Sequence, residues 1–276
     1  MFKLENELVR VEISLHAAEI TSFFDKETNS ERMYQPVEGY WSGRNPILFP
    51  QISSTKTKEY YTKGQKYSMG NHGFTRNSEF DFEYQIDNEL CLSFQDNEKT
   101  LKQYPFHFKL MVYYTLVEKK LSIRYVIENK NIDTLYFGFG LHPAFKCPVF
   151  EGEKYEDYEL EFPCMENQTN EFSEFMINKK IKINRELFQK APTLIYENLN
   201  SPYVELRNGS HGVRVDCAGF PLMAFWTPDD APFICLEPWM SDPVSKYECD
   251  ELKERSRSLE LKNNKFYTFS YGIEIF

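Results

Sequence analysis

The chain has 276 residues, 41% of them hydrophobic and 16% aromatic, and its 42 acidic and 32 basic residues give a net charge of −10. A chain of this length buries enough surface to fold without a metal ion or a disulfide. The acidic balance argues against binding to nucleic acid, and no apolar run of about 18 residues predicts a membrane span.

Cysteine usage and the N-terminus indicate a cellular compartment. The six cysteines are scattered and include no Cys-x-x-Cys pair, so a zinc knuckle or a redox motif is not predicted. The first ten residues lack the apolar segment of a secretory signal. We therefore expect reduced cysteines and a cytoplasmic protein, while the choice between a monomer and a homodimer stays open.

Apolar and polar residues alternate along much of the chain, which is typical of half-buried β-strands. The alternating segments, in chain order, are 8–15, 79–86, 121–128 and 158–162. More continuous apolar runs, which predict strands covered on both faces, lie at 110–117, 134–140, 222–226 and 233–236, and a strand-like tail spans 266–276. Short turn segments separate these runs. The pattern predicts an all-β protein with an antiparallel sandwich or barrel, in one domain over 1–276.

Helices are expected at only two places. Residues 97–103 start with Asn, a preferred helix N-cap, and stop before a proline. Residues 185–190 form the second candidate, and the polar segment 166–186 before it is interpreted as an excursion from the sheet.

Two segments in the first third of the chain carry candidate binding groups. Arg44 and Asn45 stand between Gly43 and Pro46, and an arginine offers five donors suited to sugar hydroxyls or phosphate. The second segment is Asn71-His72-Gly73-Phe74-Thr75-Arg76, in which a glycine permits a sharp turn beside the histidine. A loop that crosses a site and an ordinary turn fit this segment equally well.

Two later segments place a titratable residue before a proline. His142 ends an apolar run and precedes Pro143, and Glu237 follows the run 233–236 and precedes Pro238. Proline restricts the residue before it to extended backbone, and an imidazole and a carboxylate suit proton transfer on a neutral substrate. The alternatives are a histidine satisfied within the core and a glutamate paired with a nearby arginine.

Taken in order, four segments resemble the aldose 1-epimerase (galactose mutarotase-like) family, and more narrowly its bacterial LacX-like branch. They are Gly43–Pro50, the His-Gly-Phe-x-Arg of 72–76, Gly138–Phe145 (GFGLHPAF) and Pro232–Trp239 (PFICLEPW). The resemblance implies a large antiparallel β-sandwich, the galactose mutarotase-like supersandwich, with a sugar site in a groove on one sheet.

The same resemblance implies roles for individual residues. Glu237 matches the general base that takes the proton of the anomeric hydroxyl, and His142 matches the acid that protonates the ring oxygen. His72 and Arg44 match groups that hold and polarise the sugar, with Asn45 and Arg76 beside them. The reaction needs no cofactor.

One feature departs from the family pattern. Members often carry an aspartate that grips sugar hydroxyls, but the comparable segment here, 187–196, has no carboxylate. The preferred sugar therefore stays open, including a hexose 6-phosphate, and a non-catalytic carbohydrate-binding protein is the alternative. A metal site built from His72, His142 and Glu237 is not expected, because their spacing matches no local metal motif.

Overall fold

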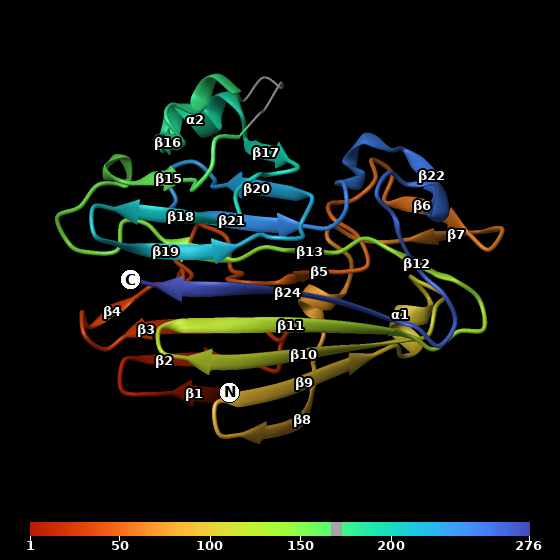
Figure 1. Ribbon diagram of the computed structural model, residues 1–276. Helices are drawn as coiled ribbons and strands as arrows, with labels where there is room; N and C mark the ends of the chain where they lie inside the picture. The colour runs from red at the N-terminus through yellow and green to blue at the C-terminus, as the bar shows by residue number, and fades with distance from the viewer. Residues whose placement is uncertain (167–172) are drawn as a thin grey trace.

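The computed structural model describes residues 1–166 and 173–276, so part of the predicted excursion at 166–186 lies outside the described residues. Strands dominate, as expected. Within the described residues the paired strands are antiparallel, except that β22 (Cys249–Glu251) runs parallel to β6 (Glu59–Thr62). The widest sheet has nine strands (Figure 1). Their order is β16 (Lys180–Lys182), β15 (Glu159–Glu161), β18 (Tyr203–Asn208), β19 (His211–Asp216), β24 (Phe266–Ile275), β11 (Lys120–Asn129), β10 (Phe108–Val117), β9 (Glu89–Gln95) and β8 (Asp81–Ile86).

The sheet that positions the candidate site has five strands in a row and a sixth, β14, that pairs with β21. These are β17 (Thr193–Glu197), β20 (Leu222–Trp226), β21 (Phe233–Trp239), β13 (Gly140–Leu141), β5 (Ile47–Leu48) and β14 (Ala144–Lys146).

The remaining strands form three smaller sheets. They consist of β1 (Phe2–Glu5), β2 (Val9–Ile13), β3 (Ile20–Asp25) and β4 (Ser30–Glu31); of β12 (Leu135–Phe137) and β23 (Leu259–Leu261); and of β22 (Cys249–Glu251), β6 (Glu59–Thr62) and β7 (Gln65–Ser68).

Both expected helices are present as short elements. Helix α1 (Glu98–Leu101) begins after Asn97, whose side chain accepts hydrogen bonds from the amides of Lys99 and Thr100. Helix α2 spans Arg185–Lys190 and has Asn184 as its N-cap. No helix within the described residues is long and apolar enough to cross a membrane.

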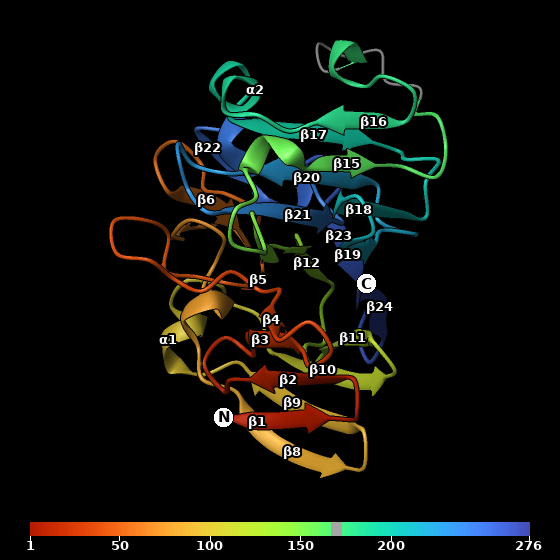
Figure 2. The ribbon, with the colours of Figure 1, turned by 90° about the vertical axis from the view of Figure 1, so that its left-hand side faces the viewer.

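The sheets stack into a sandwich (Figure 2). The side view shows β24 and β11 along the right-hand edge, with β3, β4 and β5 nearer the middle of the molecule. Alternate residues of β10 and β11 point inward, and most aromatic side chains join the same buried core. The prediction that 110–117 is covered on both faces is therefore wrong, whereas β21 is buried along its whole length. The nine-stranded sheet therefore packs through this core against the sheet that carries β21.

The segment at 79–86 is a strand, but it is not half buried as its pattern predicts. Phe82 and Ile86 are 50% and 62% exposed. The strand β8 is the last in its sheet, and its pairing with β9 shifts register between Phe82 and Tyr84. An edge position and a bulge leave both side chains largely exposed, although the Phe82 ring stacks on that of Phe2 with centroids 4.9 Å apart.

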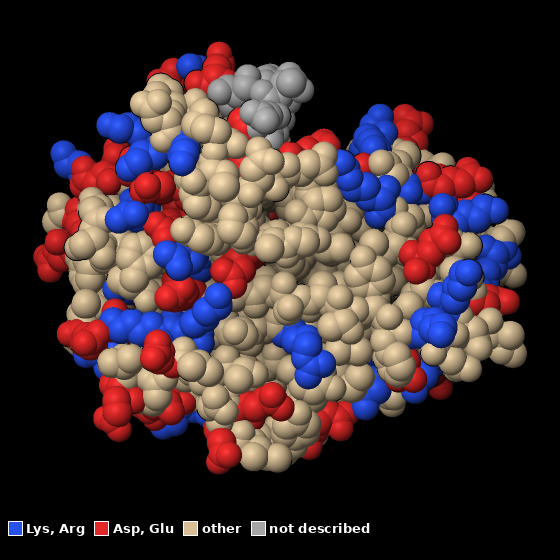
Figure 3. Space-filling view, in the orientation of Figure 1, with Lys and Arg blue, Asp and Glu red and all other residues tan. Residues whose placement is uncertain are grey.

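The face of the molecule over β10, β11 and β24 is mostly uncharged in its middle (Figure 3). Acidic and basic side chains gather around this area, and over β18, β19 and β24 they pair with one another. Arg214, for example, binds Glu205 and Glu274. On this face the basic side chains alternate with acidic ones rather than forming a patch for a polyanion.

Candidate active site

His142 and Glu237 lie side by side, as the two proline-bounded segments suggested. His142 follows β13, which is held between β5 and β21, and the Leu236 amide donates to the carbonyl of Pro143 at 3.1 Å. These bonds fix the segment against β21. As a result, Nε2 of His142 lies 3.4 Å from Oε2 of Glu237.

Both groups are deeply buried, with His142 7% and Glu237 1% exposed. Glu237 forms no ion pair with a lysine or an arginine among the described residues, so the alternative of a carboxylate held by Arg44 or Arg76 is not observed. Its other polar contact is a hydrogen bond from Trp239 Nε1 at 3.2 Å. A buried carboxylate with so few partners carries a free-energy cost that a purely structural role does not explain.

Burial shifts the pKa values of the two groups in opposite directions. Desolvation raises the pKa of Glu237 well above its ordinary value, although the Trp239 hydrogen bond opposes the shift. Desolvation, and to a smaller extent the neighbouring His72 and Arg76, lowers the pKa of His142. Both shifts favour the uncharged form of each group.

One hydrogen bond fixes which nitrogen of His72 can donate to a substrate. It takes a positive φ of 62°, and its Nδ1 accepts a 3.0 Å hydrogen bond from the Ser53 amide. Desolvation and the charge of Arg76 lower its pKa to about 4, so the imidazole is neutral at pH 7. With Nδ1 occupied as an acceptor, the proton sits on Nε2. The His72 ring lies 5.7 Å from that of His142, at an angle of 89°.

These residues line one cavity of about 550 Å³, a size typical of small-molecule sites. The structure brings together four of the predicted residues there: His72, Arg76, His142 and Glu237. Arg76 makes no hydrogen bond or ion pair with any described residue. Desolvation lowers its pKa, against the opposing charge of Glu19.

All three tryptophans of the chain also line this cavity: Trp41, Trp226 and Trp239. Trp41 and Trp226 flank the His142 ring at 4.6 and 5.5 Å. Aromatic faces pack well against the C–H groups of a sugar while their N–H groups stay available for hydrogen bonds. Sequence reasoning assigned no role to these side chains, although their scarcity in so aromatic a chain is a usable signal.

Arg44 and Asn45 are not among the residues that line the cavity. Their amides donate to Oε1 of Glu19 at 2.5 and 2.8 Å, and the Asn45 side chain accepts from Tyr271. The prediction that these two residues bind substrate therefore finds no support in the geometry. They anchor the segment that carries Trp41 instead.

The remaining histidines have ordinary surroundings. Each lies beside a carboxylate, and the pairs are His16 with Glu79, His107 with Asp96 and His211 with Glu153. None of the three lines the cavity.

One further group in this region has metal-ligand chemistry. Cys235 precedes Glu237 by two residues on β21, and one ligand atom each from His142, Cys235 and Glu237 lie within 4.8 Å of one another. Sequence reasoning missed this cysteine, although residues two apart on a strand share a face.

The sequence is similar to that of a known protein family. A family model described as aldose 1-epimerase matches residues 1–274. Protein LacX, chromosomal, from Lactococcus lactis subsp. lactis is 32% identical over 296 residues, covering 99% of this chain and 98% of that protein.

Solved structures agree with that match. A galactose mutarotase related enzyme from Lactobacillus acidophilus has a TM-score of 0.88 at 29% identity, covering 100% of this chain and 97% of the other. A galactose mutarotase-like protein from Lactobacillus casei ATCC 334 shares the fold, with a TM-score of 0.91 at 24% identity over 100% of both chains.

Proposed function

Since the chain belongs to the aldose 1-epimerase family, we propose that it is a mutarotase that interconverts the α and β anomers of a hexose. The observation that carries the proposal is the 3.4 Å approach of His142 to Glu237 at the wall of a sugar-sized cavity. The anomeric hydroxyl and the ring oxygen are bonded to the same carbon. An acid and a base that serve both oxygens must therefore lie near one another, as these two groups do.

In the proposed reaction, Glu237 accepts the proton of the anomeric hydroxyl while His142 donates one to the ring oxygen. The C1–O5 bond breaks, the open-chain aldehyde turns about C1–C2, and the reverse steps close the ring as the other anomer. The pair holds one proton at the start and at the end. Sugar hydroxyls that replace water can hydrogen-bond the carboxylate and the imidazolium, which favours the charged arrangement that the empty cavity disfavours.

Neighbouring side chains support the same chemistry. The Nε2–H of neutral His72 can donate to a sugar oxygen without adding charge, and Arg76 can donate at the side of the cavity. The indole rings of Trp41, Trp226 and Trp239 line the cavity beside the pair. A donor set of this kind stabilises charge as it develops on the sugar oxygens.

Arg76 favours one class of substrate within this proposal. Arg76 lines the cavity and carries a positive charge, and no carboxylate of the described residues lies within ion-pair distance of it. Guanidinium groups bind phosphate through two parallel hydrogen bonds. A hexose that carries a phosphate is therefore the second candidate. It leaves the chemistry at C1 unchanged.

Anomer exchange measured by NMR or polarimetry, over a panel of free and phosphorylated hexoses, tests the proposal. We expect acceleration by the wild type, and a loss of about 10²–10⁴-fold in each of Glu237→Gln and His142→Asn. His107→Asn, at a surface ion pair, is the matched control and should keep full activity. Full activity in either cavity variant would overturn the assignment, and sugar binding without acceleration would identify a carbohydrate-binding protein instead.

A further inference from the structure

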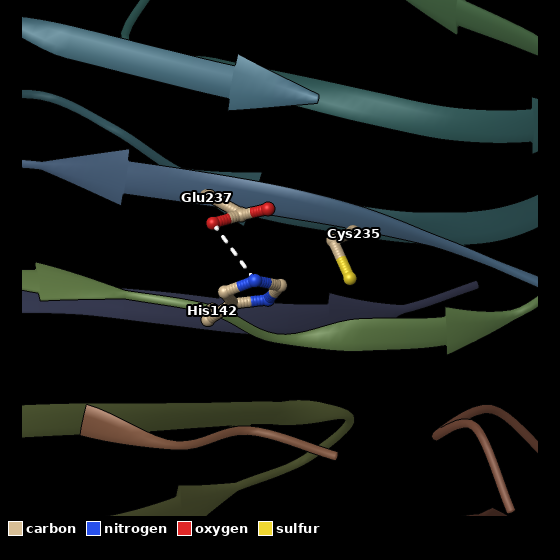
Figure 4. Close-up of side chains that lie close together, drawn as sticks. All are labelled: His142, Cys235 and Glu237. Atoms are coloured by element: carbon tan, nitrogen blue, oxygen red, sulfur yellow. Dashed lines mark ion pairs between the residues drawn. The ribbon is translucent and has the colours of Figure 1, made fainter. Parts of the chain in front are cut away.

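Three side chains with different ligand atoms converge beside the cavity (Figure 4): His142 and Glu237 line it, while Cys235 is fully buried and is not one of its lining residues. Cys235 and Glu237 project from the same face of β21 toward His142, which comes from the segment between β13 and β14. One ligand atom of each lies within 4.8 Å of the other two. The thiol of Cys235 plays no part in the proposed proton transfer, so the convergence is not explained by that reaction.

The separation of the imidazole nitrogen and the carboxylate oxygen is close to that in a zinc site. Bond lengths of about 2.0 Å to nitrogen and oxygen in a tetrahedral site place those two atoms about 3.3 Å apart. The observed separation of His142 Nε2 and Glu237 Oε2 is 3.4 Å. Thiolate sulfur, imidazole nitrogen and carboxylate oxygen are also the three donor types that Zn²⁺ uses in proteins.

An independent observation concerns the imidazole itself. His142 is 7% exposed, and its Nδ1 is buried without a hydrogen-bond partner. Buried polar nitrogens are normally satisfied. No hydrogen bond from a described residue therefore satisfies this nitrogen.

The charge balance also fits a dication. No lysine or arginine among the described residues forms an ion pair with Glu237, and Cys235 lies 0% exposed among apolar side chains. A thiolate and a carboxylate together supply two negative charges, so a bound Zn²⁺ leaves the buried site with no net charge. A neutral cluster avoids the desolvation penalty that an unbalanced buried charge incurs.

We propose that this trio, one nitrogen of His142, Sγ of Cys235 and a carboxylate oxygen of Glu237, binds a zinc-class divalent cation. Water from the cavity supplies the fourth position. Binding displaces two protons to solvent, one from the thiol and one shared by the His142–Glu237 pair. The ion occupies both groups that move protons to and from the sugar. Bound metal therefore switches the enzyme off, a consequence that rests on the proposed mutarotase function.

Titration of the full-length protein with Co²⁺ tests binding without any reference to activity. We expect one equivalent to give a thiolate-to-cobalt charge-transfer absorption that Zn²⁺ then abolishes by displacement. Cys235→Ala should lose that absorption and weaken Zn²⁺ binding by about 100-fold or more, since even residues behind the ligands change metal affinity by about 10–100-fold. Cys217→Ala, another buried free cysteine, is the matched control and should bind like the wild type.

Two outcomes would overturn the site: absence of the charge-transfer band in the wild type, or Zn²⁺ binding that Cys235→Ala leaves unchanged. Anomer exchange then separates the regulatory step from the function. Zn²⁺ should inhibit the wild type and the Cys217 variant, and should no longer inhibit Cys235→Ala at the same concentration. Binding without inhibition in an active enzyme would refute the switch, whereas an inactive wild type that still binds Co²⁺ through Cys235 would refute the mutarotase assignment alone.

Discussion

The indole Nε1 of Trp239 donates a 3.2 Å hydrogen bond to Oε2 of Glu237, two residues earlier on the same strand. Gly140 lies across from Trp239 on β13, and a Cβ at that glycine would stand 2.7 Å from the indole ring. The absence of a side chain at Gly140 therefore lets Trp239 lie where it orients the carboxylate. This hydrogen bond also lowers the pKa of Glu237, against the larger effect of desolvation that raises it.

We expect Trp239→Phe to slow anomer exchange by about ten-fold or more, because a hydrogen bond to a charged group is worth about 1.5–3 kcal/mol. The carboxylate form of Glu237 is the active base, and it forms as pH rises through the pKa of this group. Loss of the donor raises that pKa, so the acid limb of the pH–rate profile should move to higher pH. A pH series of kcat measured by NMR exchange checks both effects.

Trp226→Phe provides the control for lost indole area. Trp226 lines the same cavity and packs edge-on against His142 at 5.5 Å, but it makes no hydrogen bond to Glu237. We expect this variant to leave the acid limb in place even if its kcat changes. If the acid limb moved equally in both variants, the packing of the cavity wall, rather than the hydrogen bond from Trp239, would determine the pKa of Glu237.

Sequence patterns predicted the strands well because alternation records which face is buried. They predicted the wrong burial for Phe82 and Ile86, because alternation cannot show that β8 is the last strand in its sheet. The bulge between Phe82 and Tyr84 is equally invisible in the local pattern.

Some residues of the candidate site could be predicted from the sequence and others could not. The nearness of His142 to Glu237 follows from two proline-stiffened segments that end in the same sheet, and family motifs carried that information. Arg44 and Asn45 were placed at the substrate because no local pattern reveals Glu19, which lies about 25 residues earlier and binds both amides. Cys235 was missed because its partner His142 belongs to a distant part of the chain.

Arg76 should distinguish charged from neutral sugars. We expect Arg76→Gln to raise KM for a hexose phosphate by about ten-fold or more, since a charge-assisted hydrogen bond to phosphate is lost. The KM for the neutral hexose should change much less. Arg44→Gln is the matched control, because Arg44 faces Glu19 at 3.9 Å and does not line the cavity. Equal effects of Arg76→Gln on both sugars would exclude a phosphate contact.

Gly73 should be essential for the loop that carries His72. Its φ is +72°, and a Cβ built there would stand 2.1 Å from the carbonyl oxygen of Phe49. Gly64 has a nearly identical φ of +71° with nothing within 4 Å of a Cβ, so it isolates the cost of the backbone conformation alone. We expect Gly64→Ala to lower the free energy of unfolding by about 1–2 kcal/mol.

Gly73→Ala should cost clearly more than Gly64→Ala, because the loop must also move away from Phe49. The same movement displaces His72, so anomer exchange should fall in Gly73→Ala and stay normal in Gly64→Ala. Urea unfolding and the exchange assay measure the two effects. Similar unfolding free energies for the two variants would mean that the loop relaxes without cost and that Phe49 does not constrain it.

Asp25 and Arg32 form an ion pair whose side chains are both 0% exposed, with the two atoms 3.1 Å apart, and Lys119 lies 3.5 Å from the same carboxylate. We expect Asp25→Asn to lower the free energy of unfolding by about 3–5 kcal/mol at pH 7, because Arg32 is left buried without its counter-charge. Glu27→Gln removes a 58% exposed partner of Lys119 and should cost less than about 1 kcal/mol.

The pH dependence of this pair follows from its pKa. Desolvation acts to raise the pKa of Asp25, but the hydrogen bond from Arg32, the charge of Lys119 and two backbone amides lower it overall. A depressed folded-state pKa contributes stability that is complete above the unfolded value of about 3.9 and is lost as pH falls below it. The difference in unfolding free energy between wild type and Asp25→Asn should therefore be constant from pH 7 to about 5 and shrink towards pH 3. A constant difference across that range in urea titrations would show that the carboxylate gains nothing from Arg32.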